Sequence, residues 1–384
     1  MTPPIAILGA GPSGLTLGRL LELANIPYII FERDISAAST FTAGGTLDIH
    51  ADSGQLALQE AGLIDQFKEL AREDAPFALA DAKGKIHTIF GEDGRTDRPE
   101  IDRKDLRALL LSSVPADRVR WGLRAQNVKR DTDGSMSVHF TNGSVELGFS
   151  LVVGADGVWS RARPLVTSAK PEYSGMYYLA TSIKPDNPYF SSVVSLVGQG
   201  NYMALGDGKM VIAMKLGVGS YYIAVGLPLP EKWSTENAAL LKDSAALRES
   251  LLHDHFVDWP LVHTDLIRNS DGDFYAWPLY SMPSESLSWK TVPGIALIGD
   301  AAHLTTPFSG EGVNCAMYDS LQLAQQIIKH GLDDLSGAVS EYERLMFLRA
   351  IDVIEKSAKS GKLMLAPDAP QGWLREFAGM DITE

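Results

Sequence analysis

The sequence of 384 residues contains only one cysteine, Cys315. A single thiol excludes an internal disulfide, a C-x-x-C dithiol and a metal centre built from several cysteines, and we expect no metal site. No apolar run reaches the ~18 residues of a membrane-spanning helix, and no basic segment with a cleavage site opens the chain. We therefore expect a cytoplasmic protein with no membrane partner.

Positive charge is also scarce. The chain has 34 Lys and Arg against 48 Asp and Glu, for a net charge of −14. This balance speaks against a nucleic-acid partner, which requires a basic face. The remaining composition, 45% hydrophobic and 21% charged, is typical of a globular protein. The length exceeds one ordinary domain, so we expect two domains in a monomer.

What the sequence does contain is a glycine-rich turn near its start. Residues 5–34 read in order as strand, turn, helix and strand, and Gly9, Gly11 and Gly14 form G-x-G-x-x-G in the turn. The first glycine permits the turn, the second lets a pyrophosphate approach the backbone, and the third lets the helix pack closely. The helix N-terminus attracts phosphates, and Glu32 can accept hydrogen bonds from a ribose. The predicted dinucleotide site consists of Gly9, Gly11, Pro12, Ser13, Gly14, Glu32 and Arg33. The motif alone leaves NAD and FAD open.

A second glycine motif follows a β-meander. The dipeptides at 133–134 (Asp-Gly) and 142–143 (Asn-Gly) indicate the turns of three short antiparallel strands. A buried strand at 151–153 comes next and ends in GADG, residues 154–157. A meander that leads into such a turn resembles FAD domains of the glutathione-reductase type.

The rest of the chain predicts a second sheet and several helices. Residues 173–277 read mostly as strands, with a helical segment at 238–256, and we interpret them as an antiparallel sheet that carries the substrate. The other predicted elements are helices at 53–61, 62–74, 103–113 and 337–362, with Asp102 as N-cap of the third, and a hairpin at 77–90.

A third motif lies at residues 296–303, ALIGDAAH. A buried strand ends there in Gly299 and Asp300, and a carboxylate just past a strand end can hold a ribityl hydroxyl. The following TTPFSGEGVN leads into a helix at about residue 312. The N-terminus of that helix can stabilise negative charge on a reduced flavin.

The three motifs, in this order, resemble the single-component FAD monooxygenases of the para-hydroxybenzoate hydroxylase type, the class A aromatic hydroxylases, over nearly the whole chain. The strings FERD, GGTLDIH, PEIDRKDLRALLL, GDAAHLTTPFSGEGVN and YERLMF are similar to the tetracycline destructases within that family. The resemblance implies an α/β fold with a glutathione-reductase-type Rossmann FAD domain that contains a β-meander, an antiparallel-sheet substrate domain and C-terminal helices. The implied boundaries are 1–75, 98–170 and 278–325 for the FAD domain, 76–97 and 171–277 for the substrate domain, and 326–384 for the C-terminal helices.

The resemblance also implies roles for single residues around a non-covalent FAD. Glu32 and Arg33 would meet its adenosine end, and Asp48 would lie beside the flavin. The other implied cofactor-binding residues are Arg103 and Arg107 near the flavin and pyrophosphate, Asp156 and Gly157 in the motif tied to FAD and NADPH use, Asp300 at the ribityl region, and Pro307, Gly310, Gly312, Val313 and Asn314 at the flavin ring. Arg103, Pro307 and Gly310 are the catalytic candidates. Without the resemblance, Arg103 would read as a solvated charge on a helix.

The sequence departs from the destructases where they bind substrate. They use a Gln, an Arg and a His from the substrate sheet, and alignment places Ala180, Tyr202 and Tyr222 there. None of these can make the same charged or amide contacts. We expect a flat aromatic or polyketide-like substrate stacked among the tyrosines; the alternative is that they are ordinary sheet residues.

The implied function is an FAD-dependent monooxygenase. NADPH or NADH would reduce the flavin, and O₂ would form a C4a-hydroperoxide that hydroxylates a phenolic or enolic polycyclic compound, with tetracycline-type compounds among the candidates. Two alternatives remain: a non-hydroxylating flavin dehydrogenase or reductase, and a flavin-binding sensor without turnover.

Overall fold

The computed structural model describes residues 3–39, 44–73, 75–91, 97–377 and 379. Its first part is built on a parallel sheet of five strands, ordered β17-β11-β1-β2-β7. The strands are β1 (Ile5–Leu8), β2 (Tyr28–Phe31), β7 (Val119–Arg120), β11 (Leu151–Gly154) and β17 (Ile295–Leu297). Every residue of β1 and β11 is buried, as expected for a parallel sheet that is covered on both faces.

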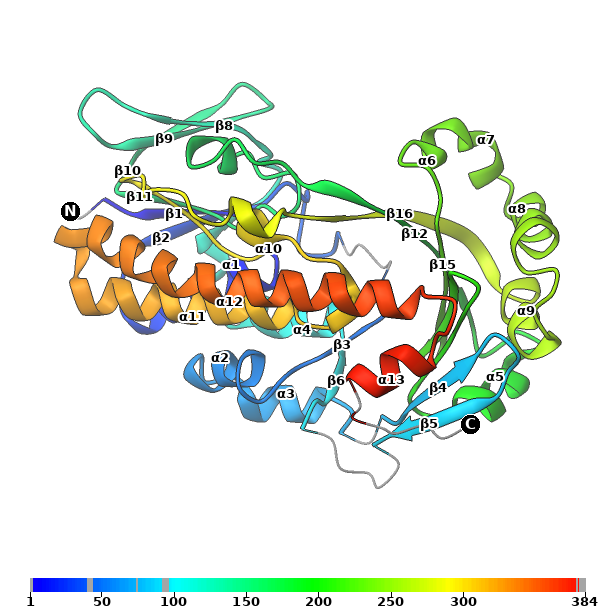
Figure 1. The fold of residues 1–384 in the computed structure, drawn as a ribbon. Coiled ribbons are helices and arrows are strands. Elements are labelled where there is room, and N and C mark those ends of the chain that lie inside the picture. The colour runs from blue at the N-terminus through cyan, green and yellow to red at the C-terminus, as the bar shows by residue number, and fades with distance from the viewer. Residues whose placement is uncertain (1–2, 40–43, 74, 92–96, 378, 380–384) are drawn as a thin grey trace.

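The predicted meander covers one of these faces. It consists of β8 (Ala125–Arg130), β9 (Met136–Phe140) and β10 (Val145–Phe149). Its Phe140 and Phe149 rings lie 5.0 and 5.8 Å from the Phe31 ring. Helices α1 (Pro12–Leu23), α11 (Gly312–His330) and the long α12 (Leu335–Met364) lie on the other side (Figure 1). The predicted Rossmann-type domain with a β-meander is thus confirmed.

A second sheet has seven strands in the order β16-β12-β15-β14-β13-β4-β5. The strands are β4 (Phe77–Asp81), β5 (Ile86–Phe90), β12 (Glu172–Ile183), β13 (Asn201–Gly206), β14 (Lys209–Lys215), β15 (Tyr221–Leu227) and β16 (Asp271–Ser281). All neighbouring pairs are antiparallel except β13 and β4, which run parallel. The predicted hairpin at 77–90 therefore joins this sheet at its edge.

Helices cover both faces of the second sheet. One face packs against α5 (Phe190–Val197), α8 (Ser244–Ser250) and α9 (Leu261–Arg268), with α6 (Trp233–Glu236) and α7 (Ala238–Leu241) nearby (Figure 1). The opposite face packs against the end of α12, α13 (Gln371–Phe377) and the short turn η5 (Pro307–Ser309). This second face points toward the part of the chain that is built on the five-stranded parallel sheet.

A two-stranded sheet of β3 (Thr46–Asp48) and β6 (Glu100–Asp102) connects the two parts. Around it lie α2 (Gly54–Glu60), α3 (Ile64–Leu70) and α4 (Arg103–Ser112). Glu100 accepts hydrogen bonds from Thr46 Oγ1 and, at 2.8 Å, from Asn201 Nδ2 of the large sheet. The predicted helix at 62–74 ends at Leu70, and residue 74 lies outside the described residues.

Asp102 stands at the N-cap position of α4 but makes no capping bond. Both of its carboxylate oxygens instead accept hydrogen bonds from the Gly217 N–H at 3.0 Å, and Oδ1 accepts one from Arg72 Nη1 at 3.1 Å. The prediction of Asp102 at the N-cap position is therefore right, but its side chain bonds Gly217 and not the first N–H groups of α4. Its side chain ties α4 to the large sheet.

Candidate flavin and substrate site

The first glycine turn contains two glycines that the packing requires, Gly9 and Gly14, and one that it does not, Gly11. A Cβ on Gly9 would lie 2.4 Å from the Ala155 carbonyl oxygen, and a Cβ on Gly14 would lie 2.0 Å from the Gly9 oxygen. A Cβ on Gly11, by contrast, would meet nothing within 4 Å. Gly11 is also the N-cap of α1 and offers no side-chain cap, so the first N–H groups of the helix are free for a ligand. This geometry fits a pyrophosphate beside Gly11.

Glu32 is fixed across the turn. Its Oε2 accepts a hydrogen bond from the Ala10 N–H at 2.6 Å, and its Oε1 accepts one from the Asp34 N–H at 2.9 Å. The carboxylate is only 7% exposed, yet each oxygen keeps a lone pair for a ribose hydroxyl. Arg33, the next residue, points to the exposed surface.

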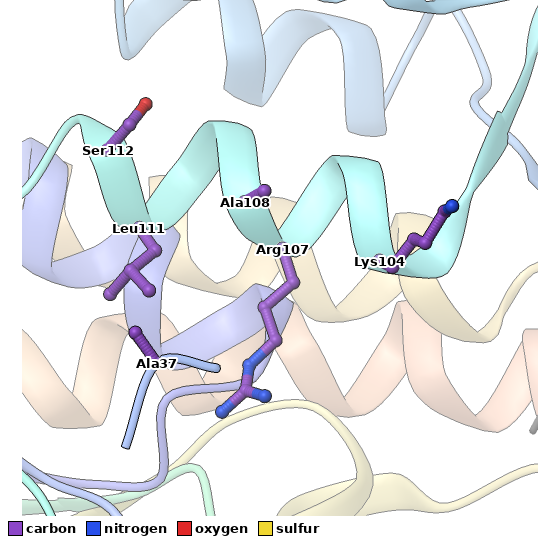
Figure 2. A pocket seen from close by; sticks show the side chains of 6 residues that line it. All are labelled: Ala37, Lys104, Arg107, Ala108, Leu111 and Ser112. Atoms are coloured by element: carbon purple, nitrogen blue, oxygen red, sulfur yellow. The ribbon is translucent and has the colours of Figure 1, made fainter. Parts of the chain in front are cut away.

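Arg107 links helix α4 to the same region. Its guanidinium donates to the Asp34 carboxylate at 2.9 Å, to the Ala10 oxygen at 3.1 Å and to the Ser39 oxygen at 3.3 Å. Figure 2 shows this side chain reaching from α4 toward the segment that follows β2. Beside it is a hollow of about 310 Å³ lined by Ala37, Lys104, Arg107, Ala108, Leu111 and Ser112. Arg107 therefore bonds Ala10 and Asp34, the two residues whose N–H groups hold the Glu32 carboxylate.

The second and third motifs meet through a residue that the sequence did not reveal. Arg163 is 4% exposed and donates to the carbonyl oxygens of Val158, Asp300 and Ala301 at 2.8–2.9 Å. Asp156 accepts a hydrogen bond from the Arg161 N–H at 2.6 Å. Arg163 thus fixes the turn around Asp156 against the turn around Asp300. Nothing in the string SRAR marks its second arginine as buried.

A buried network holds the third motif. Asp319 accepts hydrogen bonds from the Gly299 N–H at 2.8 Å, His303 Nε2 at 2.5 Å and Arg349 Nη2 at 2.5 Å. Burial lowers the pKa of His303, but its interactions with Asp319 and Cys315 raise the pKa well above its usual value, which favours the protonated form. The donor atoms of His303, Cys315 and Asp319 lie within 4.8 Å of one another. Because the His303 and Asp319 atoms already bond each other and their neighbours, the cluster reads as a brace for the loop rather than a metal site.

Asp48 meets the loop before α11. A Cβ on Gly310, whose φ is +70°, would lie 3.2 Å from both oxygens of the Asp48 carboxylate. The buried Asn314 donates to the Asp48 carbonyl oxygen at 2.9 Å and accepts from the His50 N–H at 2.8 Å. Pro307 begins η5, and Gly312 and Val313 begin α11, in the same loop. The structure therefore brings Asp48 together with the predicted ring-contacting segment.

Arg103 and Tyr222 meet at the glycine pair of the GGTLD string. A Cβ on Gly44 would lie 2.8 Å from Arg103 Cδ, and a Cβ on Gly45 would lie 2.4 Å from Met214 Sδ and 3.4 Å from Tyr222. Arg103 is accessible to solvent although protein surrounds it, and burial lowers its pKa while Tyr222 and Asp300 oppose that shift. Burial raises the pKa of Tyr222 to about 12 against the pull of Arg103. Arg103 and Tyr222 therefore lie close together, and the side chains of both keep some access to solvent.

The structure corrects one of the predicted substrate residues. Tyr202 is fully buried on the α9 face, and its hydroxyl lies 2.8 Å from Nε2 of His263. It pairs with Ala213, whereas Tyr222 pairs with Met214, the next residue of β14. Consecutive residues of a strand point to opposite faces, so the prediction that Tyr202 and Tyr222 face the substrate from the same side of the sheet is wrong. Ala180 lies on the Tyr222 face but is 1% exposed.

Other side chains of that face were missed by sequence reasoning. They are partly accessible and apolar or aromatic: Tyr178, Met203, Met214, Trp277 and Leu279. The ring of Phe308, from η5, lies 6.5 Å from that of Tyr178. The alternation along β13 could have found Met203, because it neighbours Tyr202 and must face the other way.

Known proteins resemble this chain in sequence. A family model described as FAD binding domain matches residues 2–333. The monooxygenase asqM of Emericella nidulans is 31% identical over 415 aligned positions, which cover 91% of this chain and 93% of asqM. Among the described residues, no helix combines the length and apolar character that crossing a membrane requires.

Solved structures show the same fold. HpxO of Klebsiella pneumoniae, complexed with FAD and uric acid, matches with a TM-score of 0.79 and 25% identity over 98% of this chain and 93% of its own. The tetracycline destructase Tet(55) matches with a TM-score of 0.74 over 98% of this chain and 94% of its own. At 20% identity, the second likeness shows the fold alone.

Proposed function

The chain belongs to the FAD binding domain family and resembles its FAD-dependent monooxygenases, and on that premise we propose that it uses NADPH or NADH and O₂ to hydroxylate a flat phenolic or enolic polycyclic compound. The observation that carries the proposal is the meeting of three glycine turns, with open space at Gly11, next to the pair of Arg103 and Tyr222. We propose that the substrate cavity lies at this pair.

The proposed FAD site follows the turns in order. Glu32 and Arg33 take the adenosine end, free N–H groups of α1 take the pyrophosphate, and Asp300 takes the ribityl chain. The residues assigned to the pyrophosphate and ring regions are Gly9, Gly11, Pro12, Ser13, Gly14, Asp48, Arg103, Arg107, Asp156, Gly157, Pro307, Gly310, Gly312, Val313 and Asn314. The N-terminus of α11, where Glu311 gives no side-chain cap, faces the ring with free N–H groups that stabilise negative charge.

FAD, when bound, supplies the reaction with O₂ and the transfer of an oxygen atom. The chain supplies placement and exclusion of water. The charge of Arg103 acts on Tyr222, and the same cation can stabilise a phenolate or enolate form of the substrate. Met203, Met214 and Phe308 give the cavity an apolar wall that a planar ring system can pack against.

This lining favours a neutral aromatic substrate over tetracycline. Tyr222 and Ala180 stand where the destructases are expected to use polar groups, and the partly accessible side chains of the face are apolar or aromatic. HpxO was solved with uric acid, itself a flat bicyclic compound. We therefore propose a bicyclic or fused-ring phenol or enol as the substrate.

We also propose that the chain divides as the sequence suggests, into an FAD domain, a substrate domain and C-terminal helices. One boundary moves: β16 belongs to the large sheet and ends at Ser281, so the substrate domain extends to that residue.

The proposal is tested by adding FAD to the purified protein and measuring NADPH and NADH oxidation together with O₂ uptake, across a panel of phenols and enols. A compound that stimulates both signals supports a monooxygenase. Oxidation of a compound without O₂ uptake would instead indicate a dehydrogenase, and a protein that binds no FAD would refute the site.

A further inference from the structure

Four charged side chains form a row from the proposed flavin site to the surface: Asp48, His50, Glu311 and Lys356, which we name the His50 chain. Asp48 Oδ2 lies 2.8 Å from His50 Nε2, and Glu311 Oε2 lies 3.4 Å from His50 Nδ1. Lys356 Nζ lies 2.7 Å from Glu311 Oε1. The His50 side chain is 6% exposed, whereas that of Lys356 is 44% exposed. A buried imidazole therefore stands between two carboxylates.

The backbone around the first carboxylate is already fixed. Asn314 holds the Asp48 carbonyl and the His50 N–H at once, and it is fully buried. A Cβ on Gly54 would lie 2.5 Å from Asn314 Oδ1, so that position is packed tightly as well. With the backbone held, the direction of the Asp48 carboxylate depends on His50, the side chain that hydrogen-bonds it among the residues that the structure describes.

The charges around His50 favour its protonated form. The groups that face it are Asp48 from β3, Glu311 before α11, and Arg98 before β6. Burial lowers the pKa of His50, but hydrogen bonding to the two carboxylates raises it to about 9. In return, His50 and then Lys356 lower the pKa of Glu311 to about 2. Both nitrogens of a protonated imidazole are donors, whereas a neutral imidazole has one donor and cannot serve two carboxylates.

We propose that His50 and Glu311 are positioning residues: the protonated imidazole, anchored by Glu311, holds the Asp48 carboxylate against Gly310 at the flavin ring. Neither residue needs to touch the cofactor, because both act through Asp48. The inference rests on the proposed function for the identity of the ligand. It adds that the hold on FAD weakens when His50 loses its proton.

The sign of the pH dependence follows from the two shifts. The folded pKa of His50 lies above its usual value of 6.5, so its contribution to stability is complete below pH 6.5 and is lost as the pH rises through about 9. The folded pKa of Glu311 lies below its usual value of 4.5, so its contribution is present above pH 4.5 and is lost as the pH falls toward 2. The His50 chain therefore stabilises the fold most between pH 4.5 and 6.5.

The first test follows the protonation of His50 directly by NMR on histidine-labelled protein without FAD. The His50 signal is assigned by its loss in His50→Gln. We expect a titration midpoint near 9 in the wild type, lowered in Glu311→Gln and unchanged in Asp52→Asn, an exposed neighbour whose carboxylate accepts a hydrogen bond from Ser53. A wild-type midpoint near 6.5, or one that Glu311→Gln leaves in place, would overturn the proposal.

The second test measures the Kd for FAD between pH 6 and 10. Loss of one hydrogen bond to a charged group corresponds to about tenfold in affinity. The wild type should lose about that factor across the His50 transition, while His50→Gln should bind weakly at every pH. Equal pH profiles in the two proteins would refute the positioning role. If FAD binds at no pH in this range, the proposed function is refuted. The NMR result would then still decide whether His50 hydrogen-bonds both carboxylates.

Discussion

Substitution of Gly11 by alanine should separate folding from flavin binding. Gly11 has φ −83° and ψ −178°, which alanine adopts freely, and its Cβ would meet no protein atom within 4 Å. The free energy of unfolding should therefore change by no more than about 1 kcal/mol, the difference between glycine and alanine at an N-cap. The added methyl group would, however, occupy the space that the pyrophosphate needs. Overpacking of this kind costs about 1–3 kcal/mol, which raises the Kd for FAD by roughly fivefold to somewhat more than a hundredfold.

Gly14→Ala is the matched control. Its Cβ would lie 2.0 Å from the Gly9 oxygen, so the variant should lose stability without FAD as well as FAD affinity. The assay is urea unfolding of the FAD-free proteins, followed by fluorescence titration of FAD into each. If Gly11→Ala binds FAD as tightly as the wild type, or is destabilised as much as Gly14→Ala, the pyrophosphate does not lie beside Gly11.

Three further outcomes follow from the cavity. Tyr202→Phe should destabilise the protein by about 1–3 kcal/mol, because His263 loses a buried partner, and it should leave KM unchanged. Tyr222→Phe should instead change KM with little loss of stability. A raised KM in Tyr202→Phe would show that this residue does contact the substrate. Arg103→Ala should keep the fold, since the side chain is accessible, but it should lower the flavin content or slow flavin reduction. If flavin content and reduction rate are both unchanged, Arg103 does not belong to the flavin site. Tetracycline should show a lower kcat/KM than the best fused-ring phenol or enol of a panel. The reason is that this chain lacks the Gln, Arg and His of the destructases, and each missing hydrogen bond to a charged group costs about 1.5–3 kcal/mol. A kcat/KM for tetracycline above that of every compound in the panel would contradict the proposed substrate class.

Sequence patterns predicted the FAD part of the chain well, because its signals are local. The glycine turn lies between a buried strand and a helix, and the Asp-Gly and Asn-Gly dipeptides mark turns where Gly134 and Gly143 indeed have φ of +88° and +85°. A residue that must turn the backbone is visible in the sequence whatever packs against it. The order of the three motifs then fixed the fold.

The substrate part was harder because its elements are defined by packing. Helix α5 was read as strand since its sequence, FSSVVSLV, contains three valines. Its apolar residues at 190, 193, 194 and 197 have helical spacing, which was the better signal. Tyr202 and Tyr222 were assigned to one face, but they pair with Ala213 and Met214, consecutive residues of β14 that point to opposite faces.

Residues that act at long range left no pattern. Arg163 connects turns that are more than 130 residues apart, and Asp102 bonds Gly217 rather than its own helix. Such partners depend on which loops meet in the folded protein. The sequence could name Asp48 and Gly310 separately, through the resemblance, but not their contact.

The central claim is that this chain transfers an oxygen atom from O₂ to an aromatic or enolic substrate by means of bound FAD. The most direct measurement is mass spectrometry of the product formed under ¹⁸O₂, with the FAD-loaded protein, NADPH or NADH, and the best substrate of the panel. We predict a product that carries a single ¹⁸O atom from O₂ and that does not form without FAD. A product that is oxidised without gaining ¹⁸O would contradict the claim.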